Sequence, residues 1–176
     1  MTIELIKIPT DADWSLCRMA AMNTIWRDGG IDTVPTAEWK HRILRARHSP
    51  IRVLTFYIRM RGIPYWVSTH LVRHVHAVPF VSTQRNDRQT MYDRREAPQG
   101  SLVNMDWYMN AEELLTIAHK RLCTQASPET RAVVHAICDK VVEACPEFTG
   151  LLVPMCEYRG GVCTEFKPCG RAKVIE

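Results

Sequence analysis

Hydrophobic and polar positions follow two periods along the chain, one typical of strands and one typical of helices. Period-two alternation and runs of β-branched or aromatic side chains predict extended segments over residues 1–8, 51–60 and 77–83. Apolar residues at helical spacing predict five helices, over residues 11–26, 36–47, 63–74, 102–123 and 128–144. Gly62 is expected to turn the chain ahead of the helix that Pro64 begins.

Two segments carry neither pattern. Residues 86–100 are polar, basic and typical of a loop, and the chain from Pro146 onward is rich in Gly, Pro and Cys. A chain of 176 residues fits one domain and can bury enough surface to fold without disulfides or a structural metal. We therefore expect one domain over residues 1–150, followed by a Cys/Gly-rich tail over residues 151–176.

The composition is that of an ordinary globular protein, with 46% hydrophobic and 24% charged residues. The net charge of +4 suits a small anionic ligand and is too weak to argue for nucleic acid. No apolar run approaches the roughly 20 residues that span a bilayer, and the N-terminus does not resemble a signal peptide. Seven cysteines without a secretion signal favour a reducing compartment, so we expect a cytoplasmic protein.

Arginine and histidine gather in the middle of the chain. The cluster comprises His70, Arg73, His74, His76, Arg85, Arg88, Arg94 and Arg95. A guanidinium binds phosphate through two parallel bonds, so a few converging arginines can hold a nucleotide monophosphate without a Gly-rich loop. A solvated basic loop is the alternative, and the charge pattern alone leaves both readings open.

One motif in this cluster has a specific spacing. Arg73-His74-Val75 is followed, after seven residues, by Thr83-Gln84-Arg85. This resembles the signature of the flavin-dependent thymidylate synthases, which is Arg-His-Arg, seven residues, then Ser, with Arg two positions further on.

The segments around the motif agree in order. His48-Ser49-Pro50 before VLTFYI resembles the family's lead into a strand, and Arg94-Arg95-Glu96-Ala97-Pro98 is similar to its Arg-x-x-Leu-Pro. The segment NMDWYMNAEELLTIAHKRLC resembles the family's helix with Asn-x-Arg and a later Leu-Arg, and ASPETRAVVHAICDKV resembles its Ala-Gln-x-Glu-Ile-Arg helix. The resemblance covers about residues 14–150.

The resemblance implies an α/β (α+β) fold in which a small mixed or antiparallel sheet packs against long helices. It implies a methyltransferase that moves a one-carbon unit from methylene-tetrahydrofolate to C5 of dUMP, in nucleotide biosynthesis. FAD would carry the hydride and NADPH would reduce the flavin. The partners would be a small-molecule nucleotide and further copies of the chain, as a tetramer or dimer, because the family's site forms between subunits.

The resemblance also assigns roles to matching positions. The residues expected to bind the substrate are His70, Arg73, Arg85, Arg94 and Arg121, and the residues expected to act in catalysis are Arg121 and Thr83. The residues expected to bind the cofactor are Thr55, Arg73, His74 and Asn110.

Several positions depart from the family pattern. Val75 replaces the third signature residue, Phe80-Val81 replaces an Asn-Glu pair, and Glu112 replaces the Arg of Asn-x-Arg. His70 replaces a Gln. The nucleotide half of the site is kept and the flavin half is altered, which leaves two alternatives. One is a flavin-independent enzyme of the same fold, such as a pyrimidine nucleotide hydroxymethylase, and the other is a non-catalytic nucleotide-binding module.

The tail contains four cysteines that form a candidate metal site, Cys145, Cys156, Cys163 and Cys169. Four thiolates can hold zinc or an iron–sulfur cluster. No pair has the Cys-x-x-Cys spacing, and buried or free thiols are the usual alternative.

Overall fold

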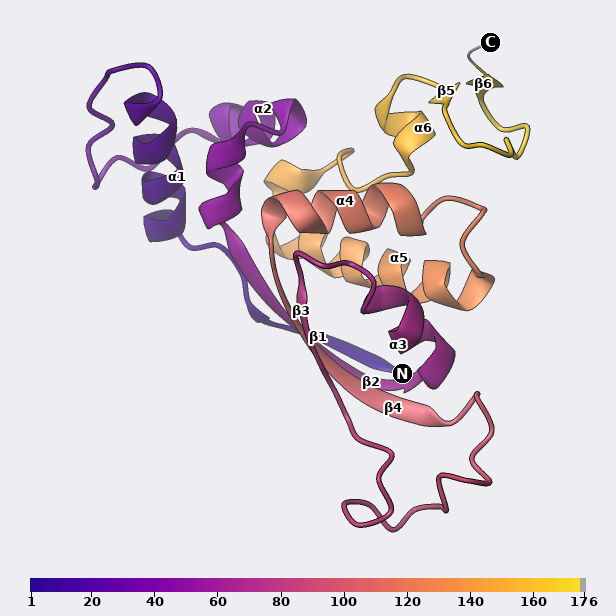
Figure 1. The fold of residues 1–176 in the computed structure, drawn as a ribbon. Helices are drawn as coiled ribbons and strands as arrows, with labels where there is room; N and C mark the ends of the chain where they lie inside the picture. Colours follow the sequence, from indigo (N-terminus) through magenta and orange to yellow (C-terminus); the bar gives the residue numbers. More distant parts are fainter. Residues whose placement is uncertain (175–176) are drawn as a thin grey trace.

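A computed structural model describes residues 1–174 of the chain (Figure 1). Four antiparallel strands form one sheet in the order β1-β2-β4-β3. The strands are β1 (Thr2–Lys7), β2 (Thr55–Pro64), β3 (Val78–Val81) and β4 (Leu102–Asn110). Long helices lie across one face of this sheet, which confirms the predicted fold class.

The helices are α1 (Asp11–Asn23), α2 (Ala37–Ala46), α3 (Tyr65–Leu71), α4 (Ala111–Arg121), α5 (Pro128–Ala144) and α6 (Met155–Tyr158). Two 3-10 helices, Ser49–Val53 and Pro146–Phe148, and two short parallel strands, β5 (Val162–Cys163) and β6 (Lys173–Val174), complete the described chain. Side-chain oxygens of Thr10, Thr36, Asn110 and Ser127 cap the four longest helices. None of the helices within residues 1–174 is long and apolar enough to cross a membrane.

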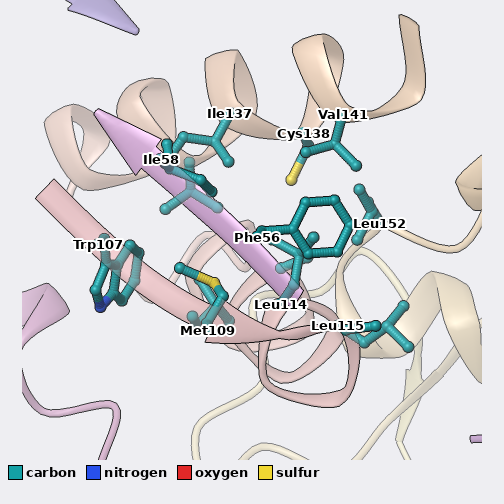
Figure 2. Close-up of a cluster of buried hydrophobic side chains, with 14 of the residues drawn as sticks. Phe56, Ile58, Trp107, Met109, Leu114, Leu115, Ile137, Cys138, Val141 and Leu152 are labelled. Carbon is teal, nitrogen blue, oxygen red and sulfur yellow. The ribbon is translucent and has the colours of Figure 1, made fainter. Parts of the chain in front are cut away.

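The core lies between the sheet and helices α4 and α5. Alternate residues of the two central strands, among them Phe56, Ile58, Trp107 and Met109, are fully buried on the helical face. Figure 2 shows these side chains packed against residues of α4 and α5. Because alternate residues of a strand point to opposite faces, Tyr57, Arg59 and Asp106 fall on the other face.

The predicted helix over residues 102–123 is wrong in its first half. Residues 102–110 form β4, and α4 begins only at Ala111, after Asn110 has capped it. The burial of Val103, Met105, Trp107 and Met109 has period two, so this segment fits a strand covered on one face. The high helix propensity of the Ala-Glu-Glu-Leu-Leu run that follows obscured this boundary.

The second central strand also differs from the prediction. It begins at Thr55, because residues 49–53 form a 3-10 helix, and it continues through Gly62 to Pro64. Gly62 was expected to turn the chain and instead lies inside the strand. It adopts a left-handed φ of 68° where the register with β4 shifts between Met60 and Ile63, a conformation that favours glycine.

The expected boundary at residue 150 falls within continuous packing. Leu151 and Leu152 are buried in the same core as α4 and α5. Beyond them the tail returns to the end of α4, where Gln125 Nε2 donates to the Lys167 carbonyl oxygen at 2.7 Å. The last two residues of the predicted tail, 175–176, lie outside the described residues.

Candidate nucleotide site

A line of hydrogen-bonded polar side chains connects α4 to the segment after α3. His74 Nδ1 lies 3.2 Å from Glu113 Oε1, and Arg121 Nε lies 2.9 Å from His74 Nε2. His74 and Glu113 are both buried, with 9% and 5% of their surface exposed. The backbone of Glu113 is held at the start of α4, because its N–H donates to Asn110 Oδ1 at 2.9 Å.

This geometry determines where the His74 proton sits. A guanidinium only donates, so His74 Nε2 accepts from Arg121 and carries no proton. The ring proton therefore lies on Nδ1 and is donated to the Glu113 carboxylate. A neutral His74 thus orients Arg121 and links its positive charge to the buried negative charge of Glu113.

Arg121 has a second anchor and a cationic neighbour. Its Nη2 donates to the His70 carbonyl oxygen at 2.7 Å. Burial first, and then the positive charge of Arg73, lowers the pKa of the Arg121 guanidinium. Arg73 is exposed and pairs with no acidic side chain among residues 1–174. An exposed Arg73 near an Arg121 that has no direct carboxylate partner is suited to a phosphate.

His70 lies beside Arg121, at the corner between α3, α4 and α5. Its Nδ1 is 2.9 Å from Thr130 Oγ1 on α5, and its carbonyl oxygen is the one that anchors Arg121. The structure therefore brings together four of the predicted site residues, namely His70, Arg73, His74 and Arg121.

Two predicted cofactor residues lie elsewhere, at the strand–helix junction. Thr55 and Asn110 are direct cross-strand partners, at the first residue of β2 and the last residue of β4. The Lys7 ammonium donates to the Thr55 hydroxyl. Asn110 uses Oδ1 to cap α4, so its amide nitrogen and the remaining Lys7 protons are the hydrogen-bond donors at this junction.

The acidic replacement at Glu112 is neutralised within the chain. Its carboxylate accepts from Arg47 Nη2 at 3.0 Å and pairs with Arg52 Nε at 3.4 Å. Two arginines therefore pair with one carboxylate, and Glu112 does not bring an unpaired negative charge to this part of the chain.

The remaining predicted substrate residues belong to the loop between β3 and β4, residues 82–101. The Thr83 hydroxyl accepts from the Arg85 N–H at 3.1 Å, and Arg85 binds both carboxylate oxygens of Asp87. Arg85 and Arg94 line one open hollow in this loop. In Figure 1 the loop extends from the end of the sheet opposite α4. No contact joins Thr83, Arg85 or Arg94 to Arg121 within residues 1–174.

The structure does not support the candidate four-cysteine metal site. No group of three or more His, Cys, Asp or Glu side chains in the part of the chain described could hold a metal ion. Cys145 is buried at the end of α5, where burial raises the pKa of its thiol to about 11, and Cys163 is buried in β5. Cys169 is exposed, and contacts with Thr124 and the Arg171 backbone lower the pKa of its thiol. Cys156 and Cys169 line one small pocket, whereas Cys145 and Cys163 are buried and do not line it.

Sequence reasoning missed two groups at the site. Glu113 stands three residues after Asn110, a spacing typical of a helix start, and this gave no hint that its carboxylate turns inward to a histidine. Thr130, fully buried on α5, carried no recognisable signal because its partner His70 is 60 residues away.

Comparison with known proteins agrees with this fold. The family model described as thymidylate synthase complementing protein matches residues 93–147, which include β4, α4 and all of α5. Two crystal structures of thymidylate synthase X from Helicobacter pylori, each with FAD and dUMP, share the fold at 15% sequence identity, with TM-scores of 0.68 and 0.65. Each alignment covers 86% of this chain and 99% of the other. No curated protein matches the chain in sequence.

The matched segment and the shared fold together support membership of the chain in the flavin-dependent thymidylate synthase family. The segment from residue 93 contains Glu113, Arg121 and Thr130, so the family match covers the α4 and α5 side of the site.

Proposed function

We propose that this protein transfers a one-carbon unit from methylene-tetrahydrofolate to C5 of dUMP, as a thymidylate synthase-like enzyme. The observation that carries the proposal is the pairing of Arg73 with Arg121, whose guanidinium is oriented by His74 and the His70 carbonyl. A nucleotide phosphate or a uracil carbonyl oxygen is the natural partner of such a pair. The related enzyme from Helicobacter pylori was crystallised with dUMP, which supports the same ligand class here.

The chemistry assigned to the chain is electrostatic. Arg121 keeps its charge throughout the reaction and its position is fixed before any ligand arrives, so it stabilises negative charge that develops on the pyrimidine. Glu113 holds His74 in the tautomer that leaves Nε2 free to accept from Arg121. Without Glu113 the ring could rotate or change tautomer, and Arg121 would lose one of its two anchors.

Some of the predicted cofactor residues fit a cofactor that contains a pyrophosphate, and one does not. Arg73 offers a free guanidinium, and the junction of Lys7, Thr55 and Asn110 offers an ammonium and an amide that retain donors. His74 does not fit as a direct ligand, because both ring nitrogens are already bonded within the chain. Bound FAD would supply the hydride that completes a methyl group, with NADPH as the source of electrons.

The separation of the loop arginines from Arg121 supports an assembled site. Thr83, Arg85 and Arg94 make no contact with Arg121 within the described chain, although the family resemblance assigns Arg85 and Arg94 to the substrate and Thr83 to catalysis. We propose that the loop of one copy completes the site of another in a homo-oligomer, either a dimer or a tetramer. We also propose that the protein acts in the cytoplasm, where its free thiols stay reduced.

A second function is favoured by the exposed apolar residues where the family signature is polar. Val75 and Phe80 are 82% and 56% exposed and provide no hydrogen-bond donor to a cofactor. A flavin-independent enzyme that adds a hydroxymethyl group to the same pyrimidine carbon would need the arginine pair and not these positions.

Release of tritium from [5-³H]dUMP separates the two functions. Purified protein is incubated with methylene-tetrahydrofolate, with or without FAD and NADPH, and the pyrimidine products are identified. We expect release and thymidylate only when FAD and NADPH are present. Release without flavin, with a hydroxymethylated product, would support the second function.

An Arg121→Lys variant tests whether any release depends on the proposed site, and Arg45→Lys, an exposed position on α2, is the matched control. Release that persists undiminished in the Arg121 variant would place the chemistry elsewhere. If wild-type protein releases no tritium under any condition, the remaining alternative is a non-catalytic nucleotide-binding module.

A further inference from the structure

His70 is held by a chain of hydroxyl groups that leads into α5. The Thr130 backbone N–H donates to Ser127 Oγ at 3.3 Å, and the Ser127 hydroxyl lies 2.9 Å from Thr130 Oγ1. Thr130 Oγ1 lies 2.9 Å from His70 Nδ1. Thr130 is fully buried, so each of its hydrogen-bonding groups must find a partner inside the protein.

The direction of these bonds follows from counting protons. The Ser127 hydroxyl donates to Thr130 Oγ1, and its oxygen accepts from the Thr130 backbone N–H. Thr130 has one proton left, and His70 Nδ1 is the acceptor within hydrogen-bond distance of it. His70 Nδ1 therefore carries no proton, and the neutral ring has its proton on Nε2.

The protonated nitrogen is directed away from these partners. No residue among those described bonds to His70 Nε2, and the side chain is only partly buried. The backbone of the same residue holds Arg121 through its carbonyl oxygen. His70 thus presents a fixed N–H donor beside the arginine pair.

We propose that Thr130 is a positioning residue that makes His70 an obligate donor, and that this donor selects uracil over cytosine nucleotides. The inference rests on the proposed nucleotide site. Uracil has a carbonyl oxygen at C4, which accepts from His70 Nε2–H. Cytosine has an amino group there, so the two donors would face each other and leave both unpaired.

The residue types at these positions agree with a coupled pair. His70 stands where the family pattern has Gln, and Thr130 stands where the Ala-Gln-x-Glu-Ile-Arg pattern has Ile. An Ile at position 130 could not donate to a ring nitrogen, and a free imidazole would then exchange between its two tautomers.

Nitrogen NMR tests the tautomer directly. Protein labelled with ¹⁵N-histidine is recorded at neutral pH, and the His70 signals are assigned by their loss in His70→Gln. We expect an unprotonated Nδ1 and a protonated Nε2 in wild-type protein and in Thr130→Ser. Thr130→Val, which keeps the shape and loses the hydroxyl, should show exchange between the tautomers. Thr69→Val is the matched control, because that hydroxyl donates to the Trp66 carbonyl on the same helix as His70.

Nucleotide affinity tests the selection. Wild-type protein should bind dUMP about 30-fold more tightly than dCMP, the ratio expected when one donor is left unpaired. Thr130→Val should reduce this ratio about tenfold, whereas Thr130→Ser and Thr69→Val should keep it. An unchanged ratio in Thr130→Val, or a wild-type proton on Nδ1, would overturn the selection while dUMP still binds. Binding of neither nucleotide by wild-type protein would instead overturn the proposed function, and the selection with it.

Discussion

The corner between α3, α4 and α5 and the loop of residues 82–101 are both rich in basic side chains, and they are built in opposite ways. At the corner, Arg121 is anchored by a buried histidine and a backbone carbonyl, with Glu113 behind. In the loop, Arg85 is exposed and bonds to Asp87 two residues away. A charge cluster in the sequence therefore corresponds to a preorganised site in one region and to an adaptable surface in the other.

This difference determines how each region would use a ligand. The corner has already lost its conformational freedom on folding, so little further ordering opposes binding. The loop has no buried apolar residue of its own and is held by local polar contacts, such as Asn86 Nδ2 to Asp93 Oδ1 at 2.9 Å. We expect substitutions at the corner to affect both stability and binding, and substitutions in the loop to affect binding alone.

The largest effect is expected for Arg121→Lys. Lysine keeps the charge but loses the planar fork that bonds His74 and the His70 carbonyl at once. The lysine also cannot form the two parallel bonds that a guanidinium makes to a phosphate, and at roughly 1.5–3 kcal/mol for each charge-assisted bond their loss should weaken dUMP binding at least 100-fold. Titration calorimetry measures this, with Arg45→Lys as the control. A loss of less than fivefold would show that Arg121 is not part of the nucleotide site.

Glu113→Ala should cost about 2–3 kcal/mol in the free energy of unfolding, because it leaves the buried His74 N–H without an acceptor. Urea denaturation followed by circular dichroism gives the value. The adjacent Glu112→Ala is the matched control. Its carboxylate is nearer the surface and binds Arg47 and Arg52, so we expect a loss of no more than about 1 kcal/mol. Equal losses for the two variants would contradict a special role for Glu113.

Acid should destabilise the protein through His119, outside both regions. Burial lowers the pKa of His119 to about 4, against 6.5 in the unfolded chain, while Nε2 donates to the Leu151 carbonyl at 3.2 Å. The unfolded chain therefore binds the extra proton first, and stability falls as the pH drops from 6.5 towards 4. The expected loss between pH 7 and pH 5 is about 2 kcal/mol.

Unfolding at both pH values checks this prediction. His119→Asn should flatten the pH dependence, although it lowers stability overall. His135→Asn, at an exposed histidine on α5, should leave the dependence as it is. A pH dependence that survives in His119→Asn would assign the titration to another group.

The smallest effect on stability is expected in the loop. Arg85→Ala should change the free energy of unfolding by less than about 0.5 kcal/mol, because the side chain is exposed and its ion pair is local. Its effect on activity should nevertheless be large. Mixing Arg85→Ala with Arg121→Lys should restore part of the activity that each lacks alone, since some sites would combine an intact loop with an intact corner. No restoration, with both variants folded, would argue that each site is built from one copy.

The sequence predicted the local elements well where strong local signals exist. The helix over residues 128–144 was found with its bounds, because Ser127 caps it and Pro128 suits its first turn. Strand β4 was missed, because its alternating burial requires a partner strand on each side and a helix layer on one face. Tertiary packing, not local propensity, decides that segment.

The sequence and its family resemblance singled out His70, Arg73, His74 and Arg121, and the structure brings these four residues together. The hydrogen bonds that connect them were not predicted. The roles of Glu113 and Thr130 depend on contacts across 39 and 60 residues of chain, which no local pattern encodes. The four cysteines of the tail were predicted as one metal site, and the described residues contain no group of three or more side chains that could hold a metal ion.

We propose above that Arg73 and Arg121 bind a pyrimidine nucleotide through its phosphate. Titration calorimetry of wild-type protein with dUMP and with deoxyuridine, which lacks the phosphate, tests this proposal. We expect saturable binding of dUMP and at least 100-fold weaker binding of deoxyuridine, from the loss of about two charge-assisted bonds. Equal affinity for the two compounds, or no binding of dUMP at millimolar concentration, would contradict it.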